Sequence, residues 1–326
     1  MRVLSLLASG TEIVCALGAG DMLVGRSHEC DNPPWVRTLP SCTRPAFDVS
    51  MSSGEIDAEV RRRLHLHEPL YHVDADRIRD LHPDLLITQM HCEVCAVTPD
   101  DVDRVGCGLL ASQVLALGAG TVEGIFDGVR SIAHSLNLHS AGEDLIATMR
   151  SRMRAVTDAV RDNPTPTVMM LEWTDPIFSM GNWGPELVEA ANGRVLLGEK
   201  GQFSRAISWK EVRDADPDFL IVAPCGYDIA RTVRELPLLK ALPGWSQLKS
   251  VRAGTVAVAD GNLYFNRSGT TIVETVEILA EILHGYRGTH HRHAGAWQPY
   301  TDAPLGANYP ESPSFLTSSD PHQIAV

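Results

Sequence analysis

The sequence lacks the motifs that mark the common enzyme classes. Its 326 residues contain no Gly-x-Ser-x-Gly elbow, no Gly-x-x-x-x-Gly-Lys loop, no His-Glu-x-x-His helix and no Gly-x-Gly-x-x-Gly fingerprint. These motifs place, respectively, a serine nucleophile, a phosphate cradle, a pair of zinc ligands and a dinucleotide turn. Since no catalytic motif is recognised, we expect that the chain is not an enzyme.

Long apolar runs and basic residues are also scarce. No run of about 18 apolar residues occurs, so we expect no membrane span. The chain has 28 Lys and Arg against 41 Asp and Glu, a net charge of -13, which excludes a nucleic-acid partner because phosphate binding needs a concentrated basic surface. The one basic run, Arg61 to Arg63, is typical of a solvated helix face.

The first residues of the chain and its cysteine content indicate the cellular compartment of the protein. Met1 and Arg2 lead directly into the strand-length run Val3 to Leu7, with no apolar segment followed by a small-residue cleavage site. The cysteine count is seven, an odd number, which favours free thiols or ligands over a disulfide framework. We therefore expect a cytoplasmic protein without an export signal.

Short apolar runs recur along the chain, each followed by turn residues and a helical pattern. This alternation predicts an α/β fold of two Rossmann-like lobes with mainly parallel sheets, since one typical core is too small for this length. The expected strands are Val3 to Leu7, Leu85 to Thr88, Val114 to Leu117, Val168 to Leu171, Phe219 to Ala223 and Thr255 to Val258.

Breakers and helical spacing set the expected boundaries. The stretch 122–161 has helical spacing and predicts one long α-helix that bridges the lobes, and Asn163 to Pro166 ends it. The first helix should be capped by Ser9 or Thr11 and end at Gly18 and Gly20. The predicted units are an N-terminal lobe 1–120, a connecting helix 121–162, a C-terminal lobe 163–287 and an irregular tail 288–326.

Residues directly after the strands are the candidate ligand contacts, because ligands of open α/β sheets bind at the carboxyl ends of the strands. Ser9 and Thr11 lie at a helix start that can receive an anionic or carbonyl group, although capping alone explains them equally well. Cysteines and histidines follow three other strands and are candidate ligands of a metal ion or cluster. These candidates are Cys30, Cys92, Cys95 and Cys225, with His28 and His91 as substitutes.

The alternatives for these cysteines are buried, unreactive residues or a redox pair. Cys15, Cys42 and Cys107 are interpreted as core or loop residues. The His-rich stretch from Thr289 to His293 is interpreted as a polar tail that is able to bind metal only loosely.

Aromatic residues form a second group of candidates. Large flat rings near a cleft suit a planar or bulky ligand, and a nearby arginine is available for an acidic group. The residues are Trp173, Trp183, Trp209, Tyr264 and Phe265, with Arg267 as the cation. Packing in the core is the alternative for each ring.

Several segments together resemble one family over about residues 2–285: the vitamin B12 and iron-siderophore substrate-binding proteins of ABC importers. The segments are Ser5 to Glu12, Leu23 to Pro34, Leu81 to Ile87, Pro176 to Gly181, Asn192 and Gly193, Trp209 to Val212, Asp216 to Asp218, and Tyr264 to Arg267. The thiol-containing loops resemble a cobalamin-binding-like subgroup that lacks a signal peptide.

The resemblance implies two lobes joined by one rigid helix, small hinge motion and a ligand in the cleft between the lobes. It implies ligand contacts at Trp173 and Trp209, and it places Glu29 and Gln89 where B12 binders carry aromatic rings. The leading hypothesis is therefore a binding protein for cobalamin or another corrinoid. An ABC importer is the implied partner, although the missing export signal argues against delivery to one.

Two alternatives stay open. The cysteines predict an iron–sulfur or zinc centre that bridges the lobes, and a third class is an enzyme with a reactive thiol.

Overall fold

The first lobe is built on a parallel sheet. The computed structural model describes residues 1–90, 96–104, 113–288 and 295–300. The sheet has the order β2-β1-β5-β6 with every pairing parallel. Its strands are β1 (Val3–Ser5), β2 (Leu23–Arg26), β5 (Leu85–Gln89) and β6 (Gln113–Leu117), and a ribbon of β3 (Thr43–Pro45) and β4 (Tyr71–Val73) lies beside it. Its helices are α1 (Ala8–Ala16), α2 (Ser53–His65), α3 (Ala75–Leu81) and α4 (Pro99–Arg104).

The second lobe has a parallel centre with antiparallel edges. Strands β7 (Thr167–Thr174), β9 (Arg194–Val195), β11 (Phe219–Val222) and β12 (Val256–Ala259) pair in parallel, and β8 (Ile177–Ser179), β10 (Arg205–Ala206) and β13 (Trp297–Pro299) add antiparallel pairings. Its helices are α7 (Gly184–Ala190), α8 (Trp209–Ala215), α9 (Ile229–Lys240), α10 (Lys249–Ala253) and α11 (Ile272–His284), with a short turn η4 (Gly261–Phe265). The predicted α/β fold with two lobes is confirmed.

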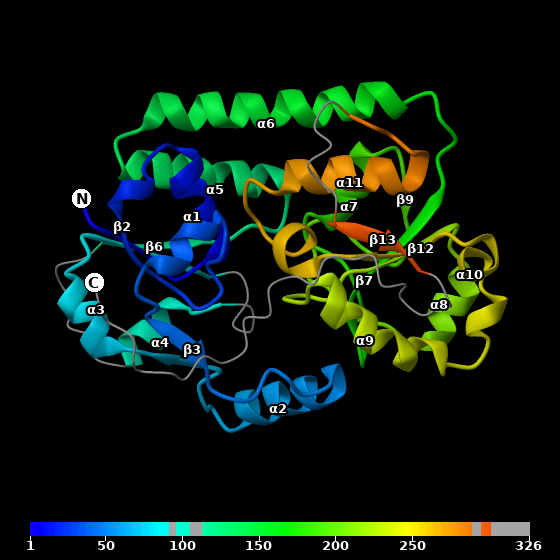
Figure 1. The fold of residues 1–326 in the computed structure, drawn as a ribbon, viewed down its shortest axis with the longest axis horizontal. Helices are drawn as coiled ribbons and strands as arrows, with labels where there is room; N and C mark the ends of the chain where they lie inside the picture. Colours follow the sequence, from blue (N-terminus) through cyan, green and yellow to red (C-terminus); the bar gives the residue numbers. More distant parts are fainter. Residues whose placement is uncertain (91–95, 105–112, 289–294, 301–326) are drawn as a thin grey trace, which may run out of the picture.

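Two helices, and not the predicted single helix, occupy the connecting stretch. They are α5 (Val122–Ser135) and α6 (His139–Val160). The chain turns between them at Asn137, which has the left-handed φ of 58° that Asn tolerates better than most residues. Helix α6 spans about 33 Å at 1.5 Å per residue, and it runs along one side of both lobes (Figure 1).

One apolar core passes through both lobes beneath α5 and α6. It contains Val3 and Ile13 of the first lobe, Phe126 of α5, and Val168 and Leu279 of the second lobe. The lobes therefore share buried apolar surface on the α6 side, which is the geometry expected of a firm connection.

Two local expectations were wrong. Helix α1 starts at Ala8 with Leu7 as its N-cap and no side-chain cap, so Ser9 and Thr11 lie inside the helix. The tail expected to be irregular contributes β13, which pairs with β12. In the part of the chain that the structure describes, no helix has the length and apolar character needed to cross a membrane.

The close packing of α5 and α6 is testable at Gly142. A Cβ added there would lie 2.6 Å from the Cβ of Ala133, whereas one added at Gly128 would meet nothing closer than 3.9 Å. We expect Gly142→Ala to lower the free energy of unfolding by about 1–3 kcal/mol through overpacking. The control Gly128→Ala should raise it by about 0.5–1 kcal/mol. Urea denaturation measures both, and equal effects would contradict this packing.

Candidate functional site

A buried arginine from the second lobe pairs with two carboxylates from the first. Arg267 is 6% exposed, and its guanidinium donates to Glu12 at 2.7 Å and to Asp31 at 2.6 Å. Glu12 lies on α1, and Asp31 lies on the loop after β2. Asn262 adds a hydrogen bond from its amide to Asp31 at 3.0 Å. The loop after β12 is thereby fixed to the first lobe.

The pKa values of Glu12 and Arg267 are both shifted by their burial and by each other. Burial raises the pKa of Glu12, which opposes its ionisation, and Arg267 only partly offsets that effect. Burial lowers the pKa of Arg267, but Glu12 and Asp31 more than offset this and raise it. Two contacts of 2.6–2.7 Å from one guanidinium favour the ionised pair at neutral pH.

The role predicted for Arg267 toward a ligand stays a prediction. The sequence predicts Arg267 as the cation for an acidic group of the ligand, whereas in the structure its guanidinium pairs with Glu12 and Asp31. A buried arginine must find carboxylate partners to offset its desolvation, and in this fold α1 and the loop after β2 supply them.

His28 and Glu29 lie on the first-lobe side of this network. His28 Nδ1 lies 2.7 Å from Thr43 Oγ1, which also accepts the backbone N–H of His28 at 3.0 Å. The ring contacts Tyr71 at a centroid distance of 5.5 Å. Burial, with Arg26 nearby, lowers the pKa of His28 to about 4, so the imidazole is neutral at neutral pH.

The other ring nitrogen of His28 faces Glu29. His28 Nε2 lies 3.9 Å from the Glu29 carboxylate, beyond hydrogen-bond distance. Burial between the lobes raises the pKa of Glu29 to about 7, an effect that Arg267 opposes and Asp31 strengthens. Since 38% of the Glu29 side-chain surface is still exposed, water reaches this carboxyl.

Trp173 and Tyr227 lie on the second-lobe side. Their rings contact each other at a centroid distance of 5.2 Å, and the backbone carbonyl of Tyr227 accepts the N–H groups of Gly261 and Asn262. Contacts therefore run from Trp173 through Tyr227 and Asn262 to Asp31 and its neighbours His28 and Glu29. We call the residues of these four loops, 26–32, 172–176, 223–231 and 260–267, the interlobe site.

Acidic residues outnumber basic ones in the interlobe site. Its loops contain the acids Glu29, Asp31, Glu172, Asp175, Asp228 and Asp260, and the bases Arg26, Arg231 and Arg267. Each arginine donates to protein acceptors: Arg26 to backbone carbonyls, Arg231 to the carbonyl of Ser50 and the hydroxyl of Tyr227, and Arg267 as described above. The site is suited to a neutral or cationic ligand.

The predicted metal ligands do not come together in the described residues. Cys30 is fully buried in the first lobe, accepts a hydrogen bond from Thr11 at 3.0 Å and lies 3.2 Å from the hydroxyl of Ser27. Burial raises the pKa of its thiol, which disfavours the thiolate that metals bind. Cys225 is half-buried on the other lobe.

Cys92, Cys95, Cys107, His91 and the tract from Thr289 to His293 lie outside the described residues. Within those that are described, no group of three or more His, Cys, Asp or Glu side chains is arranged to hold a metal ion. A cysteine-ligated centre bridging the lobes is not favoured.

The remaining predicted contacts are packed against protein groups. Ser9 is buried with its hydroxyl 3.4 Å from that of Ser268, and the Gln89 amide donates to the carbonyl of Ala96 at 3.2 Å. Phe265 is wholly buried and Tyr264 packs beside it in the core. Trp183 is 8% exposed, and its indole N–H has no partner in the described part of the chain.

Trp209 lies apart from the interlobe site. Its ring stacks on Trp245 at a centroid distance of 6.1 Å, and its indole N–H donates to the carbonyl of Pro243 at 2.7 Å. Both contacts are within the second lobe, at helix α8 (Figure 1).

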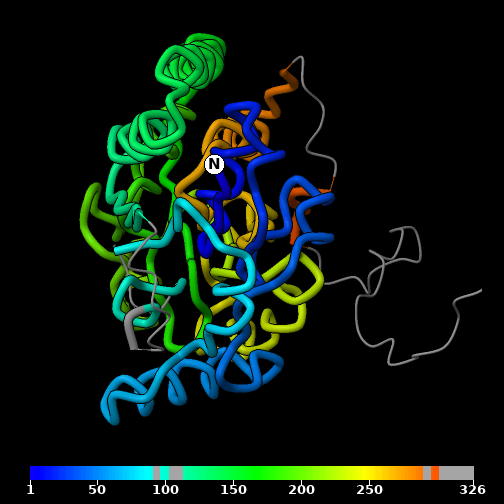
Figure 2. Tube along the Cα trace, turned by 90° about the vertical axis from the view of Figure 1, so that its left-hand side faces the viewer, coloured from blue at the N-terminus to red at the C-terminus, as the bar shows by residue number. Residues whose placement is uncertain are grey.

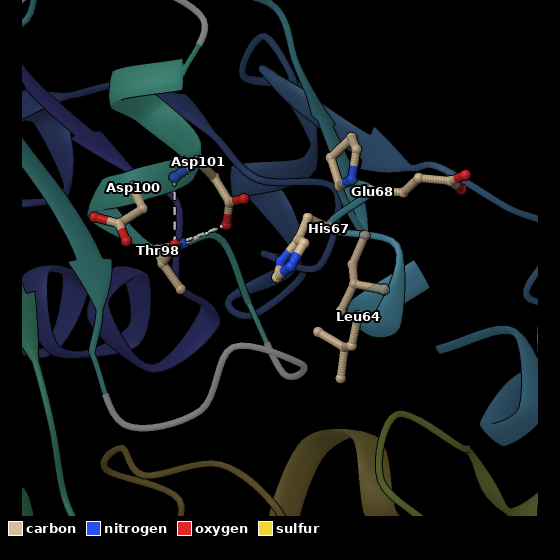
Figure 3. A pocket seen from close by; sticks show the side chains of 8 residues that line it. Leu64, His67, Glu68, Thr98, Asp100 and Asp101 are labelled. Atoms are coloured by element: carbon tan, nitrogen blue, oxygen red, sulfur yellow. Dashed lines mark hydrogen bonds between the residues drawn. The ribbon is translucent and has the colours of Figure 1, made fainter. Parts of the chain in front are cut away.

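A small pocket opens in the first lobe beyond the C-terminal end of α2 (Figure 3). It is lined by Leu64, His67, Glu68, Pro69, Leu70, Thr98, Asp100 and Asp101, and its volume is about 80 Å³. Figure 3 shows the Thr98 hydroxyl bonded to Asp101, at 2.8 Å. This volume holds a few water molecules and is far below that of a drug-sized ligand.

Tyr227 and Asn262 of the interlobe site were not predicted from the sequence, and neither was Glu12 as the partner of Arg267. Tyr227 and Asn262 come after predicted strands. The rule that ligands bind at the carboxyl ends of strands, which singled out Cys225, therefore applies to them as well. Glu12 was interpreted only as a helix-dipole partner, and no sequence signal links it to a residue 255 positions away.

These features define a two-lobed ligand-binding protein, because side chains from both lobes meet at the ends of their sheets. The chain belongs to the periplasmic binding protein family, whose model matches residues 3–263. The family consists of binding proteins, in agreement with the predicted absence of catalysis. No sequence among the curated proteins matches the chain.

Solved structures share the fold at low sequence identity. A periplasmic heme-binding protein from Pseudomonas aeruginosa has a TM-score of 0.66 at 20% identity, over 88% of this chain and 94% of that one. The periplasmic vitamin B12-binding protein of Vibrio cholerae has a TM-score of 0.61 at 17% identity, over 86% and 96%. A periplasmic binding protein from Veillonella parvula has a TM-score of 0.67 at 14% identity, over 88% and 92%.

The ion pairs of Arg267 generate a stability prediction. Arg267→Met leaves Glu12 buried without a cation, so the free energy of unfolding should fall by about 3–5 kcal/mol near neutral pH. Burial raises the pKa of Glu12 and Arg267 opposes this, so removal of Arg267 raises that pKa further, and the loss should grow as pH rises from about 5 to about 8. Denaturant titrations at several pH values measure it.

Two controls accompany this variant. Adding Glu12→Gln should restore part of the loss, since it removes the unpaired charge. Lys210→Met, at the exposed pair with Asp214, should cost less than about 1 kcal/mol. A loss in Arg267→Met that is small or independent of pH would show that the buried pair is not ionised.

Proposed function

We propose that this protein binds a neutral or cationic corrinoid, of the cobalamin or cobinamide type, in the interlobe site. The family match supports a ligand-binding role, and the vitamin B12-binding and heme-binding neighbours share the fold. The observation that carries the choice between these ligand types is the charge of the site, where all three arginines are already engaged by protein acceptors.

The charge of the interlobe site disfavours heme as the ligand. Heme carries two propionates, and carboxylates are best received by arginine forks. Segments 91–95 and 105–112 contain no Lys or Arg either. A corrinoid instead carries amide side chains, and its cobalt is cationic. The carboxyl of Glu29 suits both features, since it accepts N–H groups and its ionised form favours positive charge, whereas Asp31 is already paired with Arg267.

His28 supplies the group that best fits the cobalt. Its Nε2 makes no hydrogen bond in the described residues, and its imidazole is neutral because its pKa is lowered to about 4. The Nδ1 contact to Thr43 fits either tautomer, because the hydroxyl can donate or accept, and the tautomer with its proton on Nδ1 leaves the lone pair on Nε2 for a metal. Trp173 offers a half-buried ring on the opposite lobe for the apolar face of the ligand.

Titration with hydroxocobalamin, cobinamide and hemin tests the proposal. We expect the two corrinoids to bind more tightly than hemin. His28→Ala should weaken corrinoid binding at least about tenfold, or about 1.4 kcal/mol, and abolish the change in the cobalt spectrum. His72→Ala changes an exposed histidine of β4 and serves as the control, with less than about twofold effect. Tighter binding of hemin, or equal effects of both variants, would contradict the proposal.

A further inference from the structure

A second connection between the lobes lies on the side opposite α6. Helix α2 occupies that side in two views (Figures 1 and 2). The segment 50–54, which includes the start of α2, contacts β7 and α9 of the second lobe. We call this segment the strap.

The strap is held by a buried polar cluster. Ser53 is wholly buried and donates its hydroxyl to Glu235 at 2.7 Å, while it accepts the hydroxyl of Thr174 at 2.9 Å. Glu235 is 4% exposed and pairs with Arg231 at 2.9 Å. Arg231 in turn donates to the carbonyls of Ser50 and Met51. A buried carboxylate is thus satisfied by groups from both lobes.

The strap also fixes a ring of the interlobe site. The indole N–H of Trp173 donates to the carbonyl of Ser53 at 3.2 Å and to that of Asp175 at 3.1 Å. Arg231 lies over the ring of Tyr227, with its Cζ 4.7 Å from the ring centroid. Movement of the strap away from the second lobe therefore removes one acceptor of the Trp173 indole and the Ser50 and Met51 acceptors of Arg231.

We infer that the strap is a releasable latch, and that ligand exchange at the interlobe site requires its detachment from Glu235 and Arg231. This inference rests on the proposed function for the position of the ligand in the interlobe site. The opening of the strap does not depend on which ligand binds. On the α6 side a continuous apolar core joins the lobes. On the strap side the connection consists of directional polar contacts, which water replaces without loss of hydrogen bonds when the lobes separate.

An engineered disulfide tests the latch. A Cβ at Gly54 would lie 3.7 Å from the Cβ of Asp175, within the range of about 3.5–4.5 Å found in disulfides. In Gly54→Cys/Asp175→Cys, oxidation should slow both association and dissociation of cobinamide at least about tenfold, and dithiothreitol should restore both rates. Peptide mapping identifies the 54–175 pair among the native cysteines. Asp175→Cys alone is the control.

A readout without ligand keeps the two hypotheses distinct. Hydrogen exchange of backbone amides in 50–58 should slow at least about tenfold on oxidation, because the cross-link removes local opening. If no corrinoid binds any variant but this slowing occurs, the proposed function fails and the strap is still shown to open. If exchange is unchanged by the cross-link, or if cobinamide rates are equal in the oxidised and reduced forms, the latch is refuted.

Discussion

The rest of the interlobe geometry depends on the buried pairing of Arg267 with Glu12 and Asp31. A guanidinium that is 6% exposed is tolerated only where carboxylates offset its desolvation, and these come from the opposite lobe. The pairing sets how the loop 260–267 meets the loop 26–32. It therefore sets the positions of His28 and Glu29 relative to Tyr227 and Trp173. The pairing also neutralises the guanidinium of Arg267, which would otherwise be available to a carboxylate of the ligand.

The lobes are joined in three chemically different ways from the α6 side to the α2 side. Next to α6 the connection is apolar and continuous with the core. At Arg267 it is ionic and buried, and at Ser53 and Glu235 it is a hydrogen-bonded cluster. Apolar burial has no preferred direction and tolerates small shifts, whereas buried charges lose their partners on separation. The arrangement favours opening that pivots near α6 and begins at the strap.

The sequence predicted the central strands well because they are buried on both faces and consist of apolar runs, as at Leu85 and Val168. It did not predict the break at Asn137, since helical spacing continues on both sides of a single left-handed residue. The rule for strand ends pointed to His28, Glu29 and Trp173, which the structure places at the ends of β2 and β7, whereas their contact with a ligand stays a prediction. It could not show that Cys30 turns inward to Thr11, because a side chain's direction depends on tertiary packing. The cytoplasmic location stays a prediction.

Arg267 shows why charge must be counted after pairing and not before. As a residue type it indicates an anionic ligand, and the family fold accommodates ligands as different as heme and vitamin B12 in its solved members. At identities of 14–22% the fold alone is shared, so the side chains of this chain have to decide between them. Once Arg26, Arg231 and Arg267 are assigned to their protein acceptors, Asp31 is assigned as well, and Glu29 is left as the carboxyl of the first-lobe loop that pairs with no arginine in the described residues. A ligand with two carboxylates, such as heme, would find no unpaired arginine among these three. A cationic metal complex with amide donors would instead be attracted to the carboxyl of Glu29.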